Sequence, residues 1–177
     1  MENKRIFKKI FIPVISSLLF SVSLTGFAGE EVVDFSGRWV VDQKRSDPGE
    51  GRREVSPSEL EIEQEENRLI VERSAVSPEG RREVLTEEYT LDGETNVNTG
   101  MRGQEIRSTV RWSDDREALI FETTQRIEPR GRRDQVREME ATEIWSLSDD
   151  GDTLTVEITR QTQRGQMKRR IVYNREN

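Results

Sequence analysis

Short turn sequences recur along this chain at intervals of about one strand length, and two turn chemistries alternate. The glycine- and arginine-rich turns are 50–53, 79–82, 100–103, 130–133 and 164–165. The acidic turns are 65–68, 92–94, 113–117 and 149–152. Because successive turns of an up-and-down β structure lie at opposite ends, the pattern predicts one arginine-bearing end and one acidic end.

The segments between these turns have the period-two alternation of half-buried strands. We expect strands at 36–42, 58–64, 69–75, 81–91, 94–99, 104–112, 118–128, 135–148, 153–163 and 166–174. No long window has a convincing helical period. The predicted fold class is therefore all-β, an antiparallel up-and-down barrel of about 8–10 strands. The assignment of turns to ends depends on 94–99 being a strand, because its loss would move every later turn to the other end.

The same alternation predicts the side chains that face the barrel interior. Most are apolar: Trp39, Val41, Leu60, Ile62, Leu69, Val71, Leu85, Tyr89, Leu91, Ile106, Val110, Trp112, Leu119, Phe121, Met139, Ala141, Trp145, Leu147, Leu154, Val156, Ile158, Met167, Ile171 and Tyr173. Four inward positions are polar: Arg73, Ser108, Thr123 and Gln125. Buried polar groups need a hydrogen-bond partner, water or a ligand, and the sequence leaves open whether the interior is filled.

The N-terminal 28 residues have the features of a signal peptide. Basic residues precede an apolar stretch, and Gly26-Phe27-Ala28 supplies the small residues of a cleavage site after Ala28. An uncleaved membrane anchor is the alternative, which a proline and several serines in the stretch disfavour. We expect a single domain at 29–177, periplasmic or secreted, without a membrane span after cleavage.

Composition excludes several functions. Removal of residues 1–28 leaves 24 Lys and Arg against 34 Asp and Glu, a net charge of −10, which argues against a nucleic-acid binder. The chain has neither cysteine nor histidine. It therefore forms no disulfide, and it lacks the commonest general base and the commonest transition-metal ligand. We expect no cofactor and no metal.

An ordered set of motifs resembles a known family. Phe35-Ser36-Gly37-Arg38-Trp39 looks like the Gly-x-Trp strand of lipocalins and wider calycins. With Lys44 and Ser46 in the next loop, and with the segments Tyr89–Gly93 and Trp145–Leu154, the chain resembles secreted bacterial lipocalin-like proteins of unassigned function. The resemblance implies that Trp39 packs across the closed end of the barrel, under a basic residue such as Arg175 or Arg169. The C-terminal helix and disulfides of true lipocalins are missing, so the resemblance extends to the fold and not to the ligand.

The arginine-bearing turns are the first candidate ligand contacts. They contribute Arg52, Arg53, Arg81, Arg82, Arg102, Arg130, Arg132, Arg133 and Arg164, and the inward Arg73, Ser108 and Gln125 complete the predicted set. Arginine binds carboxylates, phosphates and sulfates in a bidentate manner. The alternative is a solvated rim, neutralised by the acidic residues in the same turns.

Other chemistry has weaker support. The aspartates at 114–115 and 149–152 lack the spacing of a calcium loop and are ordinary hairpin residues. Carboxylate pairs are uninformative among so many acidic residues, and no Gly-x-Ser-x-Gly motif marks a nucleophile. The aromatic residues are core or line a cavity, with Trp112 and Trp145 expected at the closed end. No catalytic residue is assigned.

Three functions remain open. The leading one is a non-enzymatic barrel that binds a small ligand or an anionic envelope component. The second is a protein–protein interaction or structural module of the cell envelope with a filled barrel. The third is an enzyme of unrecognised type. The sequence specifies neither the ligand nor an oligomeric state.

Overall fold

A computed structural model describes residues 32–47, 49, 57–77, 80–100, 103–127, 137–162 and 165–176. The described chain forms ten β-strands: β1 (Gly37–Val41), β2 (Glu59–Glu65), β3 (Arg68–Val76), β4 (Arg82–Thr90), β5 (Asp92–Thr99), β6 (Glu105–Trp112), β7 (Ala118–Ile127), β8 (Arg137–Leu147), β9 (Thr153–Thr162) and β10 (Gly165–Glu176). The predicted signal peptide lies outside the described residues.

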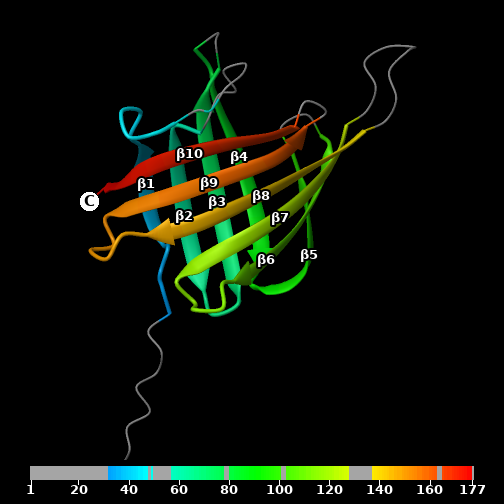
Figure 1. Cartoon of the computed structure of the whole chain (residues 1–177). Coiled ribbons are helices and arrows are strands. Elements are labelled where there is room, and N and C mark those ends of the chain that lie inside the picture. The colour runs from blue at the N-terminus through cyan, green and yellow to red at the C-terminus, as the bar shows by residue number, and fades with distance from the viewer. Residues whose placement is uncertain are drawn as a thin grey trace, which may run out of the picture. The chain divides into compact units, whose positions relative to one another are not determined.

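The strands form one antiparallel sheet that curves into a nearly closed barrel (Figure 1). Their order is β4-β3-β2-β1-β10-β9-β8-β7-β6-β5. The first and last strands pair with each other, with Trp39 opposite Arg175, and this closes the sheet between the chain ends. The sheet edges that remain are β4 and β5, which follow one another in the chain. The predicted all-β up-and-down barrel is confirmed.

The predicted strand at 94–99 exists as β5, so the condition on turn placement is met. Consecutive strands are antiparallel throughout, and each odd-numbered strand therefore ends where the next even-numbered strand begins. We call the end where β1 begins the Trp39 end and the other the opposite end. Acidic turns 113–117 and 148–152 lie at the Trp39 end, whereas Gly80 and Arg81 lie at the opposite end.

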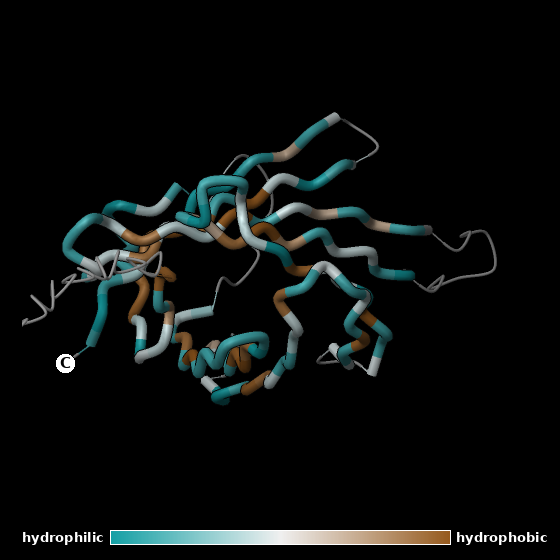
Figure 2. Tube along the Cα trace, turned by 90° about the horizontal axis from the view of Figure 1, so that it is seen from below, coloured by the Kyte–Doolittle hydropathy of each residue, from teal (hydrophilic) through white to brown (hydrophobic). Residues whose placement is uncertain are grey.

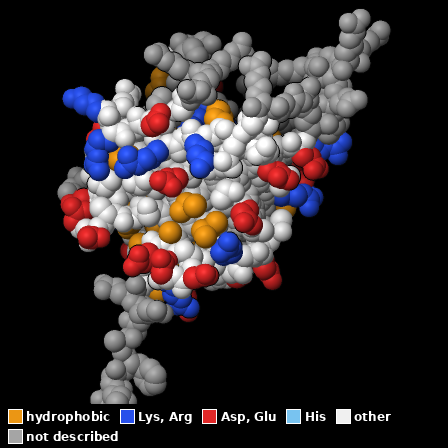
Figure 3. Space-filling view, viewed as in Figure 1, with side chains coloured by type: hydrophobic (Ala, Val, Ile, Leu, Met, Phe, Trp, Pro, Cys, Tyr) orange, Lys and Arg blue, Asp and Glu red, His pale blue; other side chains and the backbone are white. Residues whose placement is uncertain are grey.

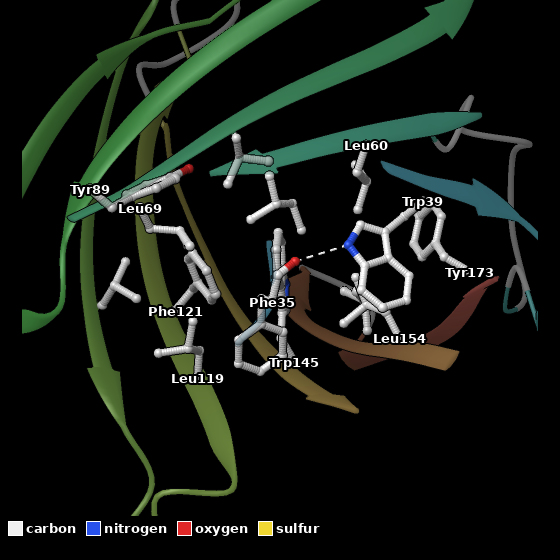
Figure 4. Close-up of a cluster of buried hydrophobic side chains, with 14 of the residues drawn as sticks. Phe35, Trp39, Leu60, Leu69, Tyr89, Leu119, Phe121, Trp145, Leu154 and Tyr173 are labelled. Atoms are coloured by element: carbon white, nitrogen blue, oxygen red, sulfur yellow. Dashed lines mark hydrogen bonds between the residues drawn. The ribbon is translucent and has the colours of Figure 1, made fainter. Parts of the chain in front are cut away.

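Alternation along the strands builds a continuous apolar core (Figures 2 and 4). In β2, for example, Leu60 and Ile62 are buried while Glu61 and Glu63 are exposed. Fully buried side chains include Trp39, Phe35, Leu119 and Trp145. Each large apolar side chain in such a core stabilises the fold by roughly 1.5–3 kcal/mol.

Trp39 is held by several contacts at its end of the barrel. Its indole Nε1 donates a hydrogen bond to the carbonyl of Phe35, 3.0 Å away (Figure 4). The guanidinium of Arg175 lies 4.2 Å from the ring centroid and donates hydrogen bonds to the carbonyls of Ser36 and Gly151. The basic residue that the resemblance implied is therefore Arg175 and not Arg169.

Gly37 leaves room for this arrangement. Its φ is +133°, and a Cβ there would lie 2.7 Å from a guanidinium nitrogen of Arg175. Any other residue would be strained in its backbone and would displace the arginine. The glycine of the Gly-x-Trp motif is thus required both by the backbone conformation and by the stacked Arg175 side chain.

The two acidic turns at this end share one hydrogen-bond pattern. Ser113 and Ser148 each donate to the aspartate two residues later and accept from the N–H five residues later. The serine hydroxyls lower the pKa of Asp115 and Asp150, and a backbone N–H adds to this effect. The carboxylates serve the turns, and no group of three or more acidic residues in the described chain is placed to hold a metal.

Candidate ligand-binding site

Arg73 of β3 is the centre of a charged cluster inside the barrel. Its Nε donates to Glu87 of β4 at 2.7 Å, and its Nη2 donates to Glu143 of β8 at 3.3 Å. The three side chains are only 16%, 7% and 17% exposed, respectively. We call Arg73, Glu87 and Glu143 the interior cluster.

The interior cluster joins opposite walls of the barrel. In the strand order, β3 and β8 are separated by β2, β1, β10 and β9 on one side and by β4, β5, β6 and β7 on the other. The ion pair between Arg73 and Glu143 therefore crosses the interior near mid-height. Below it, towards the Trp39 end, the interior is filled by apolar side chains.

Aromatic rings surround the cluster on the side of the core. The Arg73 guanidinium lies 5.2 Å from the Trp145 ring centroid, and Trp145 Nε1 donates to Glu143 at 3.0 Å. Phe121 stacks on Trp145 and meets Tyr89 edge to face (Figure 4). Trp145 was expected at the closed end; it lies at the boundary between the apolar core and the interior cluster.

Burial and charge act on the ionisable groups together. Burial alone would lower the pKa of Arg73, but Glu143 and Glu87 outweigh it and raise that pKa well above its usual value. Burial raises the pKa of Tyr89, and the charge of Glu87 adds to the effect. Burial likewise raises the pKa of Tyr173. Arg73 is therefore a cation and both phenols are neutral hydrogen-bond donors over the physiological pH range.

Polar side chains continue from the cluster towards the opposite end. Ser108 is 2% exposed, and its hydroxyl lies 2.9 Å from that of Thr123. Gln125 is half-buried two residues further along β7. Arg160 and Arg169 occupy inward positions by the alternation of β9 and β10, and Arg169 is 9% exposed. This half of the interior therefore differs in chemistry from the Trp39 end.

The predicted binding residues separate into three groups. Arg73, Ser108 and Gln125 do face inward. Arg81 is exposed, and the Arg82 side chain turns to the outer face, where it binds Ser74 and Glu59. Arg82 was predicted as a rim contact, and its guanidinium is engaged by Ser74 and Glu59 on the outer face. Arg52, Arg53, Arg102, Arg130, Arg132, Arg133 and Arg164 lie outside the described residues.

The sequence did not single out Glu87 or Glu143. Both occupy inward positions of strands that alternation placed correctly, between Leu85 and Tyr89 and between Ala141 and Trp145. A glutamate at an apolar position of an alternating strand was the available signal. It was hidden because acidic residues are so frequent in this chain.

The outer surface offers a weaker candidate. A shallow pocket of about 250 Å³ lies on the outer face of β1–β4, where Glu59 bridges Arg38 and Arg82. On another face, where β7–β10 lie in front, Figure 3 likewise shows acidic and basic side chains interspersed. Exposed ion pairs of this kind contribute little to stability, and no side chain of the pocket is directed at a ligand.

The described residues include no helix long and apolar enough to cross a membrane.

Comparisons with known proteins support the fold. No protein-family model and no curated protein matches the chain. Among solved structures, the zebrafish ileal bile acid-binding protein in complex with cholic acid is similar, with a TM-score of 0.51 and 14% identity. The match covers 80% of this chain and 98% of that protein. The chain therefore has a lipocalin-like, calycin-type barrel fold.

Proposed function

We propose that the protein binds a small amphipathic anion inside the barrel, at the interior cluster, without catalysing a reaction. The observation that carries the proposal is the ion pair that crosses the interior between Arg73 and Glu143. Outside the Trp39 end, the inward charged side chains of the described residues that are at least half-buried are Arg73, Arg160, Arg169, Glu87 and Glu143. Their net charge is +1, because Arg160 and Arg169 outweigh the charge of −1 that the interior cluster carries by itself, and this favours an anionic group.

The energetics of burial support this interpretation. Removing charged groups from water costs several kcal/mol for each ion. Replacing a buried ion pair by well-packed apolar residues therefore often leaves a fold equally stable or more stable. A buried charged cluster next to the apolar core is therefore poorly explained by stability alone. Arginine also has five N–H donors, of which the two bonds to Glu87 and Glu143 use two. A ligand carboxylate or sulfonate would bind the remaining donors.

The structural neighbour supports the same class of ligand. That protein was crystallised with cholic acid, an amphipathic carboxylate. At 14% identity the likeness concerns the fold, so a bile acid is not inferred for this chain.

An interaction module is the second candidate. The Trp39 end holds the cluster of buried apolar side chains, and the edge strands β4 and β5 share no main-chain ladder. Such an edge can accept a strand from another protein. Co-purification of one protein partner without any small molecule would favour this candidate.

The binding proposal is tested with 8-anilinonaphthalene-1-sulfonate, a fluorescent amphipathic anion. We expect saturable binding that weakens as salt is added, and at least a tenfold loss of affinity in Arg73→Met. Arg68→Met is the matched control, because Arg68 forms the other β3–β4 ion pair, with Glu88, on the outer face. Equal affinities of the two variants would contradict the proposal.

Native mass spectrometry identifies the natural ligand. The unaltered protein and Arg68→Met should each carry a co-purified small molecule that Arg73→Met lacks.

We further propose export to the periplasm or beyond, with cleavage after Ala28, as in the secreted bacterial lipocalin-like proteins that the sequence resembles. The basic and apolar N-terminal residues support this location. N-terminal sequencing of the exported protein should begin at Gly29. A retained Met1 would favour the membrane anchor.

A further inference from the structure

The junction between β4 and β5 lacks the main-chain hydrogen bonds that join the other neighbouring strands of the described barrel. β4 and β5 are joined through Leu91 alone, yet no main-chain ladder connects them, whereas every other pair of neighbouring described strands has one. We call the junction between β4 and β5 the seam. A tight connection between antiparallel strands ordinarily produces a paired hairpin, so the seam is a departure from the pattern of this barrel.

Two asparagine side chains take the place of the ladder. The Asn98 carboxamide accepts from the N–H of Glu88 at 3.0 Å and donates to the carbonyl of the same residue at 3.0 Å. Asn96 accepts from the N–H of Thr90 at 2.9 Å. The pairs Glu88–Asn98 and Thr90–Asn96 keep the register of an antiparallel pair, with side-chain amides in the position of main-chain amides.

This arrangement makes the seam the weakest junction of the barrel. Parting any other neighbouring strands breaks a row of main-chain hydrogen bonds, from four to ten residue pairs long. Parting β4 from β5 breaks no main-chain ladder, and it separates only side-chain contacts: the bonds of Asn96 and Asn98 and packing such as Tyr89 against Phe121. The bonds are side chain to main chain, and each contributes on the order of 1 kcal/mol.

The seam lies beside the interior cluster. Glu87 is the residue between Thr86 and Glu88 on β4, and its carboxylate holds Arg73. Opening of the seam would expose Glu87 and Tyr89 first, and through them Arg73. The carboxamide of Asn98 also occupies both main-chain groups of Glu88, which an added strand from a partner would need. A gate is therefore favoured over a docking edge.

We propose that the seam is a lateral gate, closed by Asn96 and Asn98, through which a small amphipathic ligand reaches the interior cluster. The inference rests on the proposed function, because it assumes an interior ligand. It adds the route of entry and the residues that set the rate. A ligand that entered at the opposite end would pass neither asparagine.

The first test measures stopped-flow association and dissociation of 8-anilinonaphthalene-1-sulfonate. We expect Asn98→Ala and Asn96→Ala each to raise both rate constants about fivefold, with Kd unchanged within about twofold. Asn174→Ala is the control, because Asn174 bonds Asp42 beside the β1–β10 junction, which has a main-chain ladder. Equal rates in the seam and control variants would overturn the gate.

The second test closes the seam and does not depend on asparagine variants that fold. Glu88 and Val97 are exposed on either side of it, and the chain has no cysteine. Glu88→Cys/Val97→Cys, joined by a short bifunctional maleimide, should bind the probe at least about tenfold more slowly than the same variant capped with a monofunctional maleimide. Unchanged rates after crosslinking would overturn the gate.

These outcomes separate the gate from the proposed function. Loss of affinity in Arg73→Met with unchanged rates in the seam variants contradicts the gate alone. Absence of any probe binding by the unaltered protein contradicts both.

Discussion

The two halves of the barrel interior differ in the kind of side chain that fills them. At the Trp39 end, aromatic and aliphatic side chains fill the interior. Among the described residues, the only cation that faces the interior there is Arg175, which stacks on Trp39 and donates hydrogen bonds to main-chain carbonyls. At mid-height, three charged side chains meet across the interior with little solvent around them. The first half stabilises the fold. In the second half, the buried charges must offset their loss of hydration, which apolar side chains in the same place would not have to do.

The change from apolar to charged side chains takes place at Trp145. One side of its indole stacks on Phe121 in the core, and its Nε1 holds Glu143 in the interior cluster. A single residue thus ends the apolar core and fixes the orientation of a charged one. Trp145, which is packed in the apolar core, thus positions Glu143 of the interior cluster through a hydrogen bond.

Removal of Trp39 should have the largest effect on stability. The side chain is fully buried, so Trp39→Ala is expected to lower the free energy of unfolding by about 3–5 kcal/mol. Urea denaturation monitored by circular dichroism measures the change. Trp112→Ala, at a half-buried tryptophan of the same end, should cost clearly less. Equal losses would show that the packing around Trp39 has no special weight.

Substitution of Gly37 should have an intermediate effect. Gly37→Ala forces a side chain into a positive-φ position and against Arg175, with an expected loss of about 1–3 kcal/mol. Gly80→Ala is the matched control, since Gly80 also has positive φ but nothing within 4 Å of its Cβ position. Denaturation should show the smaller loss for Gly80→Ala. The reverse order would refute the stacked Arg175 as the reason for Gly37.

The smallest expected effect is a gain in one of the paired turns. Arg116 has φ +59°, and Gly151 holds the equivalent position with φ +73°. Arg116→Gly should therefore raise stability by about 0.5–1 kcal/mol. Gly151→Arg should lower it by a similar amount, which thermal denaturation resolves. A loss in both variants would mean that the turns are not equivalent.

Much of the fold was predictable because its rules are local. Period-two alternation identified every described strand, including the short β5, whereas the packed end was implied by the lipocalin resemblance that Gly37-x-Trp39 carries. Local patterns also predicted that Arg73 faces inward. The partners of Arg73 were not predictable in this way, because Glu143 reaches it from the far wall of the barrel and no sequence spacing encodes that contact.

The seam is hidden from sequence for a related reason. Turn chemistry at Asp92-Gly93 predicts a hairpin, and the structure does make a tight connection there. Which neighbouring strands lack a ladder depends on how the whole sheet closes. The available signal was Asn96 and Asn98, two residues of low strand propensity alternating in a short strand.

One variant tests the contrast between the halves most directly. Arg73→Met/Glu87→Gln/Glu143→Gln removes every charge of the interior cluster, while the amide oxygen introduced in place of the Glu143 carboxylate can still accept from Trp145 Nε1. Urea denaturation and titration with 8-anilinonaphthalene-1-sulfonate are measured on the same sample. We predict a free energy of unfolding within about 2 kcal/mol of the unaltered protein, and at least a tenfold loss of probe affinity. A protein that is strongly destabilised yet binds the probe with unchanged affinity would show that the cluster supports the fold and not a ligand.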